Sequence, residues 1–577
     1  MTASKKAIEP LSQSTDSMRE TEVLVPGGVR SYVWPSVLTA LLLLVLAAFR
    51  PLALPDEGRY AEIGRWMGVS GDWLAPRLNG LPFFHKPPLL YWLEAMVSQS
   101  VGASAWAFRL IPAFHAILIL TLMGPWVQQV MGPSMARRSV IIFGTSAAFL
   151  MGGQYINHDM MVACWISVAI GVFGNFAIHA SAPEKDGVNV NVSLRGSGLQ
   201  RTAWIGFIAL ALGVLSKGLI GVVLPAWVLF LWLCWSGRWS ALKAVPWISG
   251  LLIFMGITLP WFILTERAYP GMLDYMFGVH QFARFTGTQF NNAQPVWFYV
   301  AAISLLLGLW MVWFWAYQIR VVYDFWVRNE QESVASKFKQ LTHQFMPAVQ
   351  VKRTNAQLLV GLCVVWVWAI VVFFSIPNSK IIGYVLPVTP PMSVLCALGW
   401  ERLMRGSRFE KYIWQILVVS SVLLMVLIND QATKWTERHF TVDIAKVLGC
   451  QDLSKAQIMV VGEYPYDLPF LLALERPLWV LQDWDFERTH AGDNWRRELF
   501  EGANFEPSKG EFLKPLITLA MQAGQGERWL LAPKNWSDTE QLKSSGYLLV
   551  SVGSAWNVYR TQTTQLSPTS LEGTCLK

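Results

Sequence analysis

The feature that most constrains this fold is a series of long apolar runs between residues 32 and 429. A run of roughly 17 to 25 apolar residues is long enough to cross a membrane as a helix. About eleven such runs are present, near 32–49, 110–127, 139–156, 160–178, 203–216, 218–236, 245–264, 296–318, 356–376, 381–400 and 412–429. Two more could lie in the aromatic stretch 88–101. The sequence therefore predicts a polytopic α-helical membrane protein with about 11–13 transmembrane helices.

The composition agrees with a membrane protein. Hydrophobic residues make up 53% of the chain and charged residues only 15%, whereas soluble proteins have roughly 25% charged residues. The first 30 residues are polar and lack the apolar core of a cleaved signal peptide. We therefore expect the first apolar run to be an uncleaved signal anchor and the chain to be full length.

Lysine and arginine gather in alternate loops, which predicts the orientation of the helices in the membrane. Arg137 and Arg138, for example, follow the second run, and several more basic residues fill the loop 319–356. Simple alternation of the spans places the segment 1–31 and this loop in the cytoplasm. The net charge of +8 is then largely a topology signal and gives no argument for a nucleic-acid partner.

Three segments fall on the opposite, outer face: a first loop at 52–103, a second at 265–294 and the tail 430–577. In the tail the apolar runs shorten to 457–462, 477–482, 528–532 and 548–552 and alternate with polar segments, which predicts a small α/β domain. Cys450 and Cys575 bracket this domain and are candidates for a disulfide in an oxidising compartment. The other four cysteines lie in apolar runs, where they read as small core residues.

Charged residues crowd against the end of the first run, at Asp56-Glu57-Gly58-Arg59-Tyr60-Ala61-Glu62. Charge at a membrane exit is costly unless water or a site compensates it. The simpler alternative is a solvated juxtamembrane helix. More polar residues collect on the same outer face, at 157–159, Lys217 and Lys380. No phosphate-binding glycine loop occurs in a strand-to-helix context, so we expect a substrate reached from outside or from the bilayer.

Several motifs occur in order between residue 32 and about residue 400. They are Asp56–Ile63, Gly71–Trp73, Leu81–Leu89 (which contains His85-Lys86-Pro87-Pro88), Asp159-Met160, Leu215–Leu219, Pro260–Phe262, His280–Phe285, Pro295–Tyr299 and Phe373–Pro387. Together they resemble membrane glycosyltransferases of the GT-C type. Among these the chain is most similar to the lipid A aminoarabinose transferases, which are relatives of the protein O-mannosyltransferases. The tail is matched in position and type, without a motif.

This resemblance implies a GT-C fold with periplasmic juxtamembrane helices in a bacterial inner membrane. It also implies a sugar donor carried on undecaprenyl phosphate and transferred with inversion at the anomeric carbon. A lipid phosphate leaves, and cations stabilise its growing charge. The candidate lipid-phosphate ligands are Arg59, Lys86, Arg284 and Lys380, although lysine and arginine near headgroups also snorkel.

Asp56 is the leading catalytic carboxylate by its place in the family motif, with Asp159 as a second. Either can act as general base toward a hydroxyl acceptor. Toward an anionic phosphate acceptor, the carboxylate would instead position an amino sugar or steady positive charge at the anomeric carbon. Asp159 could also cap the helix that starts beside it.

The expected substrate contacts are Glu57, Tyr60, His85, His158, Lys217, His280 and Tyr384. Glu57 and Glu62 also fit a structural role, and His158 reads more simply as a hydrogen-bonded structural histidine. Lys217 fits a tight outer turn with Gly218 equally well. His280 and Arg284 lie at helical spacing and would share one face of a helix.

Two departures from the family pattern concern acidic positions. His85 precedes the lysine of the Lys86-Pro87-Pro88 segment, and Val279 precedes the loop histidine, where the family commonly has acids. Both changes weaken a divalent metal site, for which His85 and His280 are the weak candidates. They also keep glucosamine or a neutral hexose open as the sugar.

Three functions compete. The first is transfer of 4-amino-4-deoxy-L-arabinose or another amino sugar to lipid A, with polymyxin resistance as its implied consequence. The second is a GT-C transferase acting on a protein or another envelope glycan. The third, a lipid flippase or transporter, would show broken or charged helices at mid-membrane, whereas the charges here lie at helix mouths. We expect a monomer among membrane lipids, with no certain cofactor.

Overall fold

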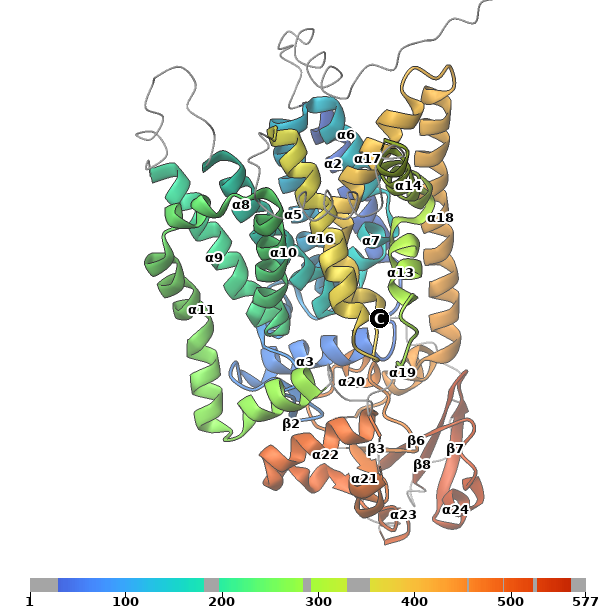
Figure 1. Cartoon of the computed structure of the whole chain (residues 1–577). Coiled ribbons are helices and arrows are strands. Elements are labelled where there is room, and N and C mark those ends of the chain that lie inside the picture. Colours follow the sequence, from blue (N-terminus) through green and yellow to red (C-terminus); the bar gives the residue numbers. More distant parts are fainter. Residues whose placement is uncertain are drawn as a thin grey trace, which may run out of the picture.

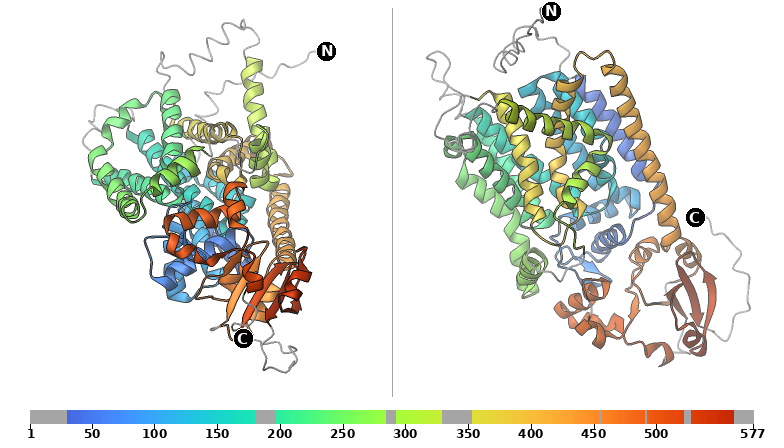
Figure 2. Two further views of the ribbon diagram at one scale, coloured as in Figure 1. Left: turned by 90° about the horizontal axis from the view of Figure 1, so that it is seen from below. Right: turned by 45° about the vertical axis from the view of Figure 1, so that its right-hand side comes forward.

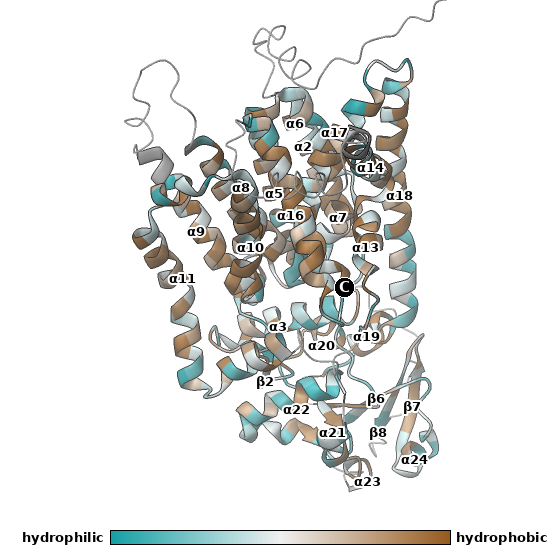
Figure 3. Cartoon of the chain, in the orientation of Figure 1, coloured by the Kyte–Doolittle hydropathy of each residue, from teal (hydrophilic) through white to brown (hydrophobic). Residues whose placement is uncertain are grey.

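The computed structural model describes residues 30–180, 197–283, 292–328, 353–453, 456–490, 492–521 and 527–561. Most of these residues form a bundle of long helices, and a smaller region built around a sheet lies at one end of the bundle (Figure 1). Colouring by hydropathy shows that the bundle helices are largely hydrophobic and that hydrophilic residues gather toward the sheet (Figure 3). The end of the bundle that faces the sheet is therefore where polar chemistry can collect.

Within the described residues, eight helical segments are long and apolar enough to cross a membrane. They are α2 (Arg30–Ala48), α5 (Ala105–Met131), α8 (His158–Ala180), α11 (Trp247–Ala268), α13 (Phe298–Leu307) continued by η5 (Gly308–Trp310) and α14 (Met311–Arg328), α16 (Asn355–Ser375), η6 (Ile382–Val388) with α17 (Thr389–Met404), and α18 (Glu410–His439). Each coincides with an expected span. The prediction of a polytopic helical membrane fold is confirmed.

Three of the expected spans are not among these eight segments. Near 203–216 and 218–236 lie α9 (Ser197–Lys217) and α10 (Ile220–Ser236), which has only 17 residues. The run 139–156 is broken into α6 (Pro133–Gly144), α7 (Ala147–Leu150) and η1 (Gly152–Gln154). It breaks because the Ser146 hydroxyl accepts a hydrogen bond from the amide of Phe149 and so starts a new helix.

The two extra spans considered for 88–101 do not form. That stretch is α4 (Leu89–Val101), which is too short to cross a membrane. It packs against α3 (Asp56–Ser70), where a Cβ on Gly64 would lie only 2.3 Å from Glu94 Cβ. The short strands β1 (Arg77–Leu78) and β2 (Leu81–Pro82) connect the two helices, and α3 lies across the end of the bundle (Figure 1).

The C-terminal region is a six-stranded mixed sheet in the order β5-β4-β3-β6-β8-β7. Its strands are β3 (Gln457–Val461), β4 (Trp479–Leu481), β5 (Leu513–Lys514), β6 (Arg528–Pro533), β7 (Tyr547–Val552) and β8 (Trp556–Thr561). The first four are parallel, and β8 pairs antiparallel with β6 and β7. Strands form at all four of the apolar runs in the tail, whereas β5 and β8 were not expected.

Short helices complete this region and the loops above it. In the C-terminal region they are α19 (Val442–Leu448), α20 (Leu468–Leu471), α21 (Trp484–His490), α22 (Trp495–Phe505), η7 (Pro507–Phe512), α23 (Thr518–Met521) and α24 (Thr539–Ser544). The helical part has η3 (Trp239–Ala244) and the π-helix η4 (Asp274–Ala283). Helix α18 runs the length of the bundle and leads into the sheet region (Figures 1 and 2). Cys450 is partly exposed, and its expected disulfide partner, Cys575, lies outside the described residues.

The sheet region shares a buried apolar cluster with α3 and α4, which includes Ile63, Tyr91, Val460 and Leu499. Two polar ties reinforce this packing. Arg65 Nη2 donates to the carbonyl of Leu474 (2.6 Å), and Asn79 exchanges two hydrogen bonds with the backbone of Leu478 (3.0 and 2.8 Å). As a result, α22 lies beside the amino-terminal end of α3.

Candidate active site

Glu57 anchors the first loop to the bundle. Its carboxylate is fully buried and pairs with Arg50 and Arg109 at 2.9–3.0 Å. It also accepts hydrogen bonds from the backbone amides of Ala53 (2.7 Å) and Ile156 (3.0 Å). Burial opposes ionisation, but attraction from Arg109 and Arg50 lowers the pKa of Glu57 to about 2. The expectation of a substrate contact is corrected, since both carboxylate oxygens are engaged inside the protein.

Asp56, the neighbouring acid, points to a more open environment. Its side chain is 39% exposed, and its Oδ1 accepts a hydrogen bond from Arg59 Nη2 at 3.2 Å. The other end of the Arg59 guanidinium pairs closely with Glu498 of α22. Burial disfavours the charge on Arg59, but Glu498 and its other acidic neighbours raise the pKa of Arg59 well above the usual value. Arg59, expected as a lipid-phosphate ligand, is therefore already shared between two carboxylates.

Asp159, Lys217 and Tyr384 come together from three elements, as their common assignment to the site predicts. The Lys217 ammonium, at the end of α9, forms a close ion pair with Asp159 in the first turn of α8. The same ammonium lies 4.7 Å from the ring centroid of Tyr384 in η6. A Cβ on Gly383 would collide with Asp159 Oδ2 at 2.0 Å, so a glycine makes room for this pair.

Asp159 does not cap its helix. That role belongs to Asn157, whose Oδ1 accepts a hydrogen bond from the Asp159 amide at 2.9 Å. The Asn157 amide group also donates to Asp159 Oδ2 at 3.0 Å. Lys217 makes this ion pair and also lies at the expected tight turn, because the next residue, Gly218, has φ of +88°.

His158 lies at the centre of the cluster. Its ring is buried and contacts Tyr60 and Tyr91 edge-on, with centroid separations of 4.8 and 5.3 Å. Lys86, Lys217 and Arg59 all act on it electrostatically. The structure thus brings Tyr60, His158 and Lys86 to one place, and it adds Tyr91, which the sequence did not single out.

One expected phosphate ligand, Lys380, does not join this cluster. Lys380 is buried, and its ammonium donates to the carbonyls of Gln294 (2.9 Å) and Pro377 (2.6 Å). It therefore ties together two loop segments, which corrects its assignment to the phosphate. Arg284 lies outside the described residues, so the helix face that it would share with His280 stays a prediction.

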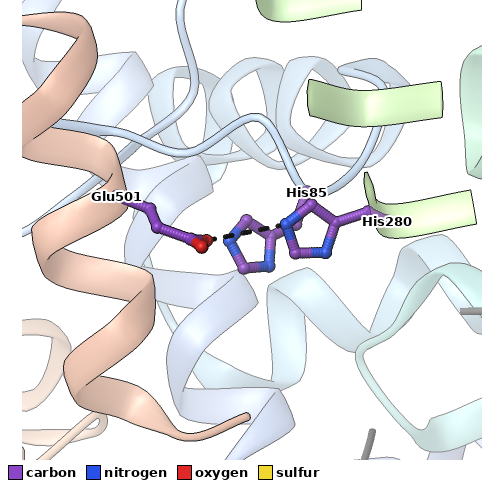
Figure 4. Close-up of side chains that lie close together, drawn as sticks. All are labelled: His85, His280 and Glu501. Carbon is purple, nitrogen blue, oxygen red and sulfur yellow. Dashed lines mark ion pairs between the residues drawn. The ribbon is translucent and has the colours of Figure 1, made fainter. Parts of the chain in front are cut away.

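His85, His280 and Glu501 form a second cluster nearby, in which the three side chains converge from a loop, from η4 and from α22 (Figure 4). One potential metal-ligating atom from each lies within 4.8 Å of the others. The Tyr275 hydroxyl contacts His85 Nε2 at 2.8 Å and donates to Glu501 Oε2 at 2.5 Å. Two imidazoles and one carboxylate are a donor set that suits zinc.

The charge state of Glu501 agrees with this donor set. Burial by itself raises the pKa of Glu501, but the nearby His280, 3.8 Å away, and hydrogen bonds from Tyr275 and Arg497 lower it below the usual value. The carboxylate is therefore ionised at neutral pH. Glu501 supplies an acid near His85 and Val279, the two positions where the family commonly has acids. It belongs to no motif that could have identified it from the sequence.

Comparison with known proteins finds similar sequences among membrane glycosyltransferases. The family model for dolichyl-phosphate-mannose-protein mannosyltransferases matches residues 50–276. Undecaprenyl phosphate-alpha-4-amino-4-deoxy-L-arabinose arabinosyl transferase 1 of Proteus mirabilis is 28% identical over 384 residues, which cover 64% of this chain and 60% of that protein. The protein of the same name from Sodalis glossinidius is 27% identical over 371 residues, covering 63% and 57%. These matches span less than two thirds of either relative.

Solved structures share the fold over most of the chain. The crystal structure of ArnT from Cupriavidus metallidurans bound to undecaprenyl phosphate superposes with a TM-score of 0.69 at 19% identity, covering 93% of this chain and 99% of that one. The archaeal oligosaccharyltransferase AglB from Archaeoglobus fulgidus, in complex with an inhibitory peptide and a dolichol-phosphate, gives 0.50 at 12% identity, covering 93% and 75%.

The fold and the clustered polar end define the class: this is a multi-pass membrane protein with the GT-C fold. Within that class, the chain resembles the undecaprenyl phosphate-aminoarabinose transferases in sequence and matches ArnT in fold.

Proposed function

We propose that this protein is an inverting glycosyltransferase that moves an amino sugar from undecaprenyl phosphate to lipid A. The best candidate for the sugar is 4-amino-4-deoxy-L-arabinose. One observation carries the proposal: Asp56, the most exposed acid of the cluster, contacts Arg59 at 3.2 Å, and Arg59 acts together with Lys86 and Lys217 on the neighbouring His158. A phosphate-linked sugar needs both kinds of group, cations for the leaving phosphate and a carboxylate near the anomeric carbon.

In this reaction the bond between the anomeric carbon and the phosphate oxygen breaks, and undecaprenyl phosphate leaves with the bonding electron pair. The acceptor oxygen forms the new bond from the opposite face, which inverts the anomeric configuration. Lys86 and Lys217 stabilise the charge on the departing phosphate. A lipid A phosphate is already anionic, so Asp56 then orients the sugar and steadies positive charge at the anomeric carbon. A hydroxyl acceptor would instead give its proton to Asp56.

The proposed location follows from the charge pattern of the loops. The basic loops belong in the cytoplasm, which puts α3, α4 and the C-terminal sheet region on the periplasmic side of an inner membrane. Undecaprenyl phosphate carries its headgroup at the same depth, where the apolar helices end. The site would therefore take both substrates from the outer leaflet.

We also propose that His85, His280 and Glu501 bind a divalent metal ion, with zinc the best match to their donor atoms. This site would fasten α22 to the loop that carries His85 and to η4, which carries His280. It lies beside the carboxylate and lysine cluster, and its role is to hold the C-terminal region in place.

Mass spectrometry of lipid A tests the function. Lipid A from a strain that expresses the protein and from a matched deletion strain should differ by one transferred sugar, and the size of the shift identifies that sugar. An aminoarabinose increment supports the proposal, whereas a hexose or glucosamine increment favours the alternative that the replaced acids at positions 85 and 279 leave open. Identical lipid A profiles, in a strain that supplies the donor, would contradict the proposal and favour a different envelope acceptor.

A further inference from the structure

A continuous hydrogen-bonded chain links the C-terminal region to the proposed catalytic carboxylate. The Tyr466 hydroxyl donates to Glu498 Oε2 at 2.6 Å, Glu498 Oε1 pairs closely with Arg59 Nη1, and Arg59 Nη2 donates to Asp56 Oδ1 at 3.2 Å. We infer that Glu498 and Tyr466 are positioning residues, which act through Arg59 to orient Asp56 for sugar transfer. This inference rests on the proposed function and assigns a catalytic purpose to the C-terminal region.

The burial of these hydrogen-bonded side chains makes them suited to this role. The Arg59 side chain is 13% exposed and that of Glu498 is 12%, whereas Asp56 at the end is 39% exposed. The Arg59 guanidinium also lies close to two aromatic rings, 4.9 Å from the centroid of Tyr466 and 5.5 Å from that of Tyr60. The buried members are thus held from several sides, and only the last carboxylate is exposed enough to reach a substrate.

Charge explains why Glu498 matters to Asp56. A guanidinium presents its donors in a planar fork, so fixing one nitrogen fixes the direction of the other. Glu498 takes Nη1 and leaves Nη2 aimed at Asp56. Without the Glu498 carboxylate, Arg59 would be free to turn both nitrogens toward Asp56 or toward an incoming phosphate, and the carboxylate would lose its set orientation.

The sheet region does not need the hydrogen bonds from Tyr466 to Asp56 in order to stay attached to the bundle. The shared apolar cluster, the Arg65 contact with Leu474 and the Asn79 contacts with Leu478 already join the two parts. Arg77 adds an ion pair with Glu506 at 2.6 Å. A Glu498 that only held the domain would be one contact among many, so its loss should be felt in catalysis more than in folding.

The experiment uses the purified full-length protein with an undecaprenyl-phosphate-linked sugar and lipid A. Glu498→Gln keeps the shape of the side chain and removes its charge. We expect kcat to fall about 10- to 100-fold, the range typical of residues that orient an active group, while KM for the donor changes less than about 3-fold. Tyr466→Phe should lower kcat by a smaller factor. The double variant should lose less than the product of the two single effects, because both act on one chain.

Glu487→Gln is the matched control. It removes an ion pair with Arg496 of the same helix α22, at 2.9 Å, without touching α3. We expect its kcat and KM to match the wild type. If Glu498→Gln behaves like this control, or lowers only the melting temperature while activity per folded molecule is kept, the inference is wrong.

A rise in KM with unchanged kcat would also overturn the positioning role, since it would mean that Arg59 acts on the donor phosphate alone. Should Glu498→Gln fail to fold, Tyr466→Phe, which keeps the aromatic ring, carries the test. A wild-type protein that transfers no sugar would end the proposed function and this inference together. An active wild type with full activity in both variants would end only the inference.

Discussion

Asp56 and Glu57 are adjacent acids on the first turn of α3, but their surroundings are opposite in kind. Glu57 turns inward to two arginines and two backbone amides and is fully buried. Asp56 contacts the Arg59 guanidinium and keeps 39% of its side chain exposed. A closed network of this kind holds structure, whereas a half-satisfied carboxylate is free to act on a substrate.

Asp56→Asn should have the largest effect, and it should fall on activity alone. We expect kcat to drop about 10³-fold, within the range for a positioned carboxylate that acts on the reacting groups. Stability should change by less than about 1 kcal/mol, because the lost contact is partly exposed. Turnover of the purified protein and its melting temperature measure the two effects. A variant that keeps a tenth of wild-type activity would remove Asp56 from the mechanism.

Glu57→Gln should reverse that pattern. It leaves Arg50 and Arg109 buried with an uncompensated charge, which typically costs about 3–5 kcal/mol. We expect a large loss of thermal stability in detergent, with activity per folded molecule close to normal. If this variant melts like the wild type but loses catalysis, Glu57 belongs with Asp56 in the site after all.

The same carboxylate makes an acid-sensitive contribution to stability. The folded pKa of Glu57 is about 2, below the usual value of 4.5. Its contribution is therefore fully present above pH 4.5 and is lost as the pH falls toward 2, amounting to about 3 kcal/mol. Melting temperatures measured between pH 5 and pH 3 should fall in the wild type. The slope should be shallower in Glu57→Gln, and equal slopes would assign the acid sensitivity to other groups.

The histidine and glutamate cluster predicts a metal-dependent gain in stability. Zinc at 100 times its dissociation constant should stabilise the folded protein by about 2.7 kcal/mol, and a chelator should reverse the shift. His280→Ala should abolish the response. His490→Ala, which removes an exposed histidine of α21, serves as the control and should respond like the wild type. A zinc response that survives in His280→Ala would place the metal elsewhere.

Glu94→Gln should have the smallest effect and sharpens the contrast with Glu57. Glu94 is also fully buried, but neither of its carboxylate oxygens has a hydrogen-bond partner among the described residues. Burial raises the pKa of Glu94 well above the usual value and so favours its neutral form. Glutamine has nearly the same shape and is also uncharged, so the substitution should change stability by less than about 1 kcal/mol. A loss as large as that of Glu57→Gln would reveal a charged partner for Glu94.

Helix positions were predictable because apolar length is read directly from the sequence. The breaks were not, since the interruption after α6 depends on one serine cap and the 88–101 stretch has the length of a juxtamembrane helix. In the site, Asp56, Asp159, Lys217 and Tyr384 were found from motifs of a known family, and the structure brings the last three into contact. Lys380 and Glu57 also lie in such motifs, but Lys380 binds backbone carbonyls and Glu57 pairs with arginines inside the protein.

Apolar length and the placement of charge are enough to predict a multi-pass membrane helix bundle with polar chemistry at the mouths of its helices. Inside a membrane, a helix pairs the backbone polar groups of an apolar run of about 20 residues within that run. Which acids stay exposed and which pair with buried arginines could be read only from the three-dimensional packing. It also brought Glu498 to Arg59 across 439 residues of chain, and Glu501 to His85 and His280. Such contacts depend on how the sheet region docks on α3, and no local pattern of residues encodes that geometry.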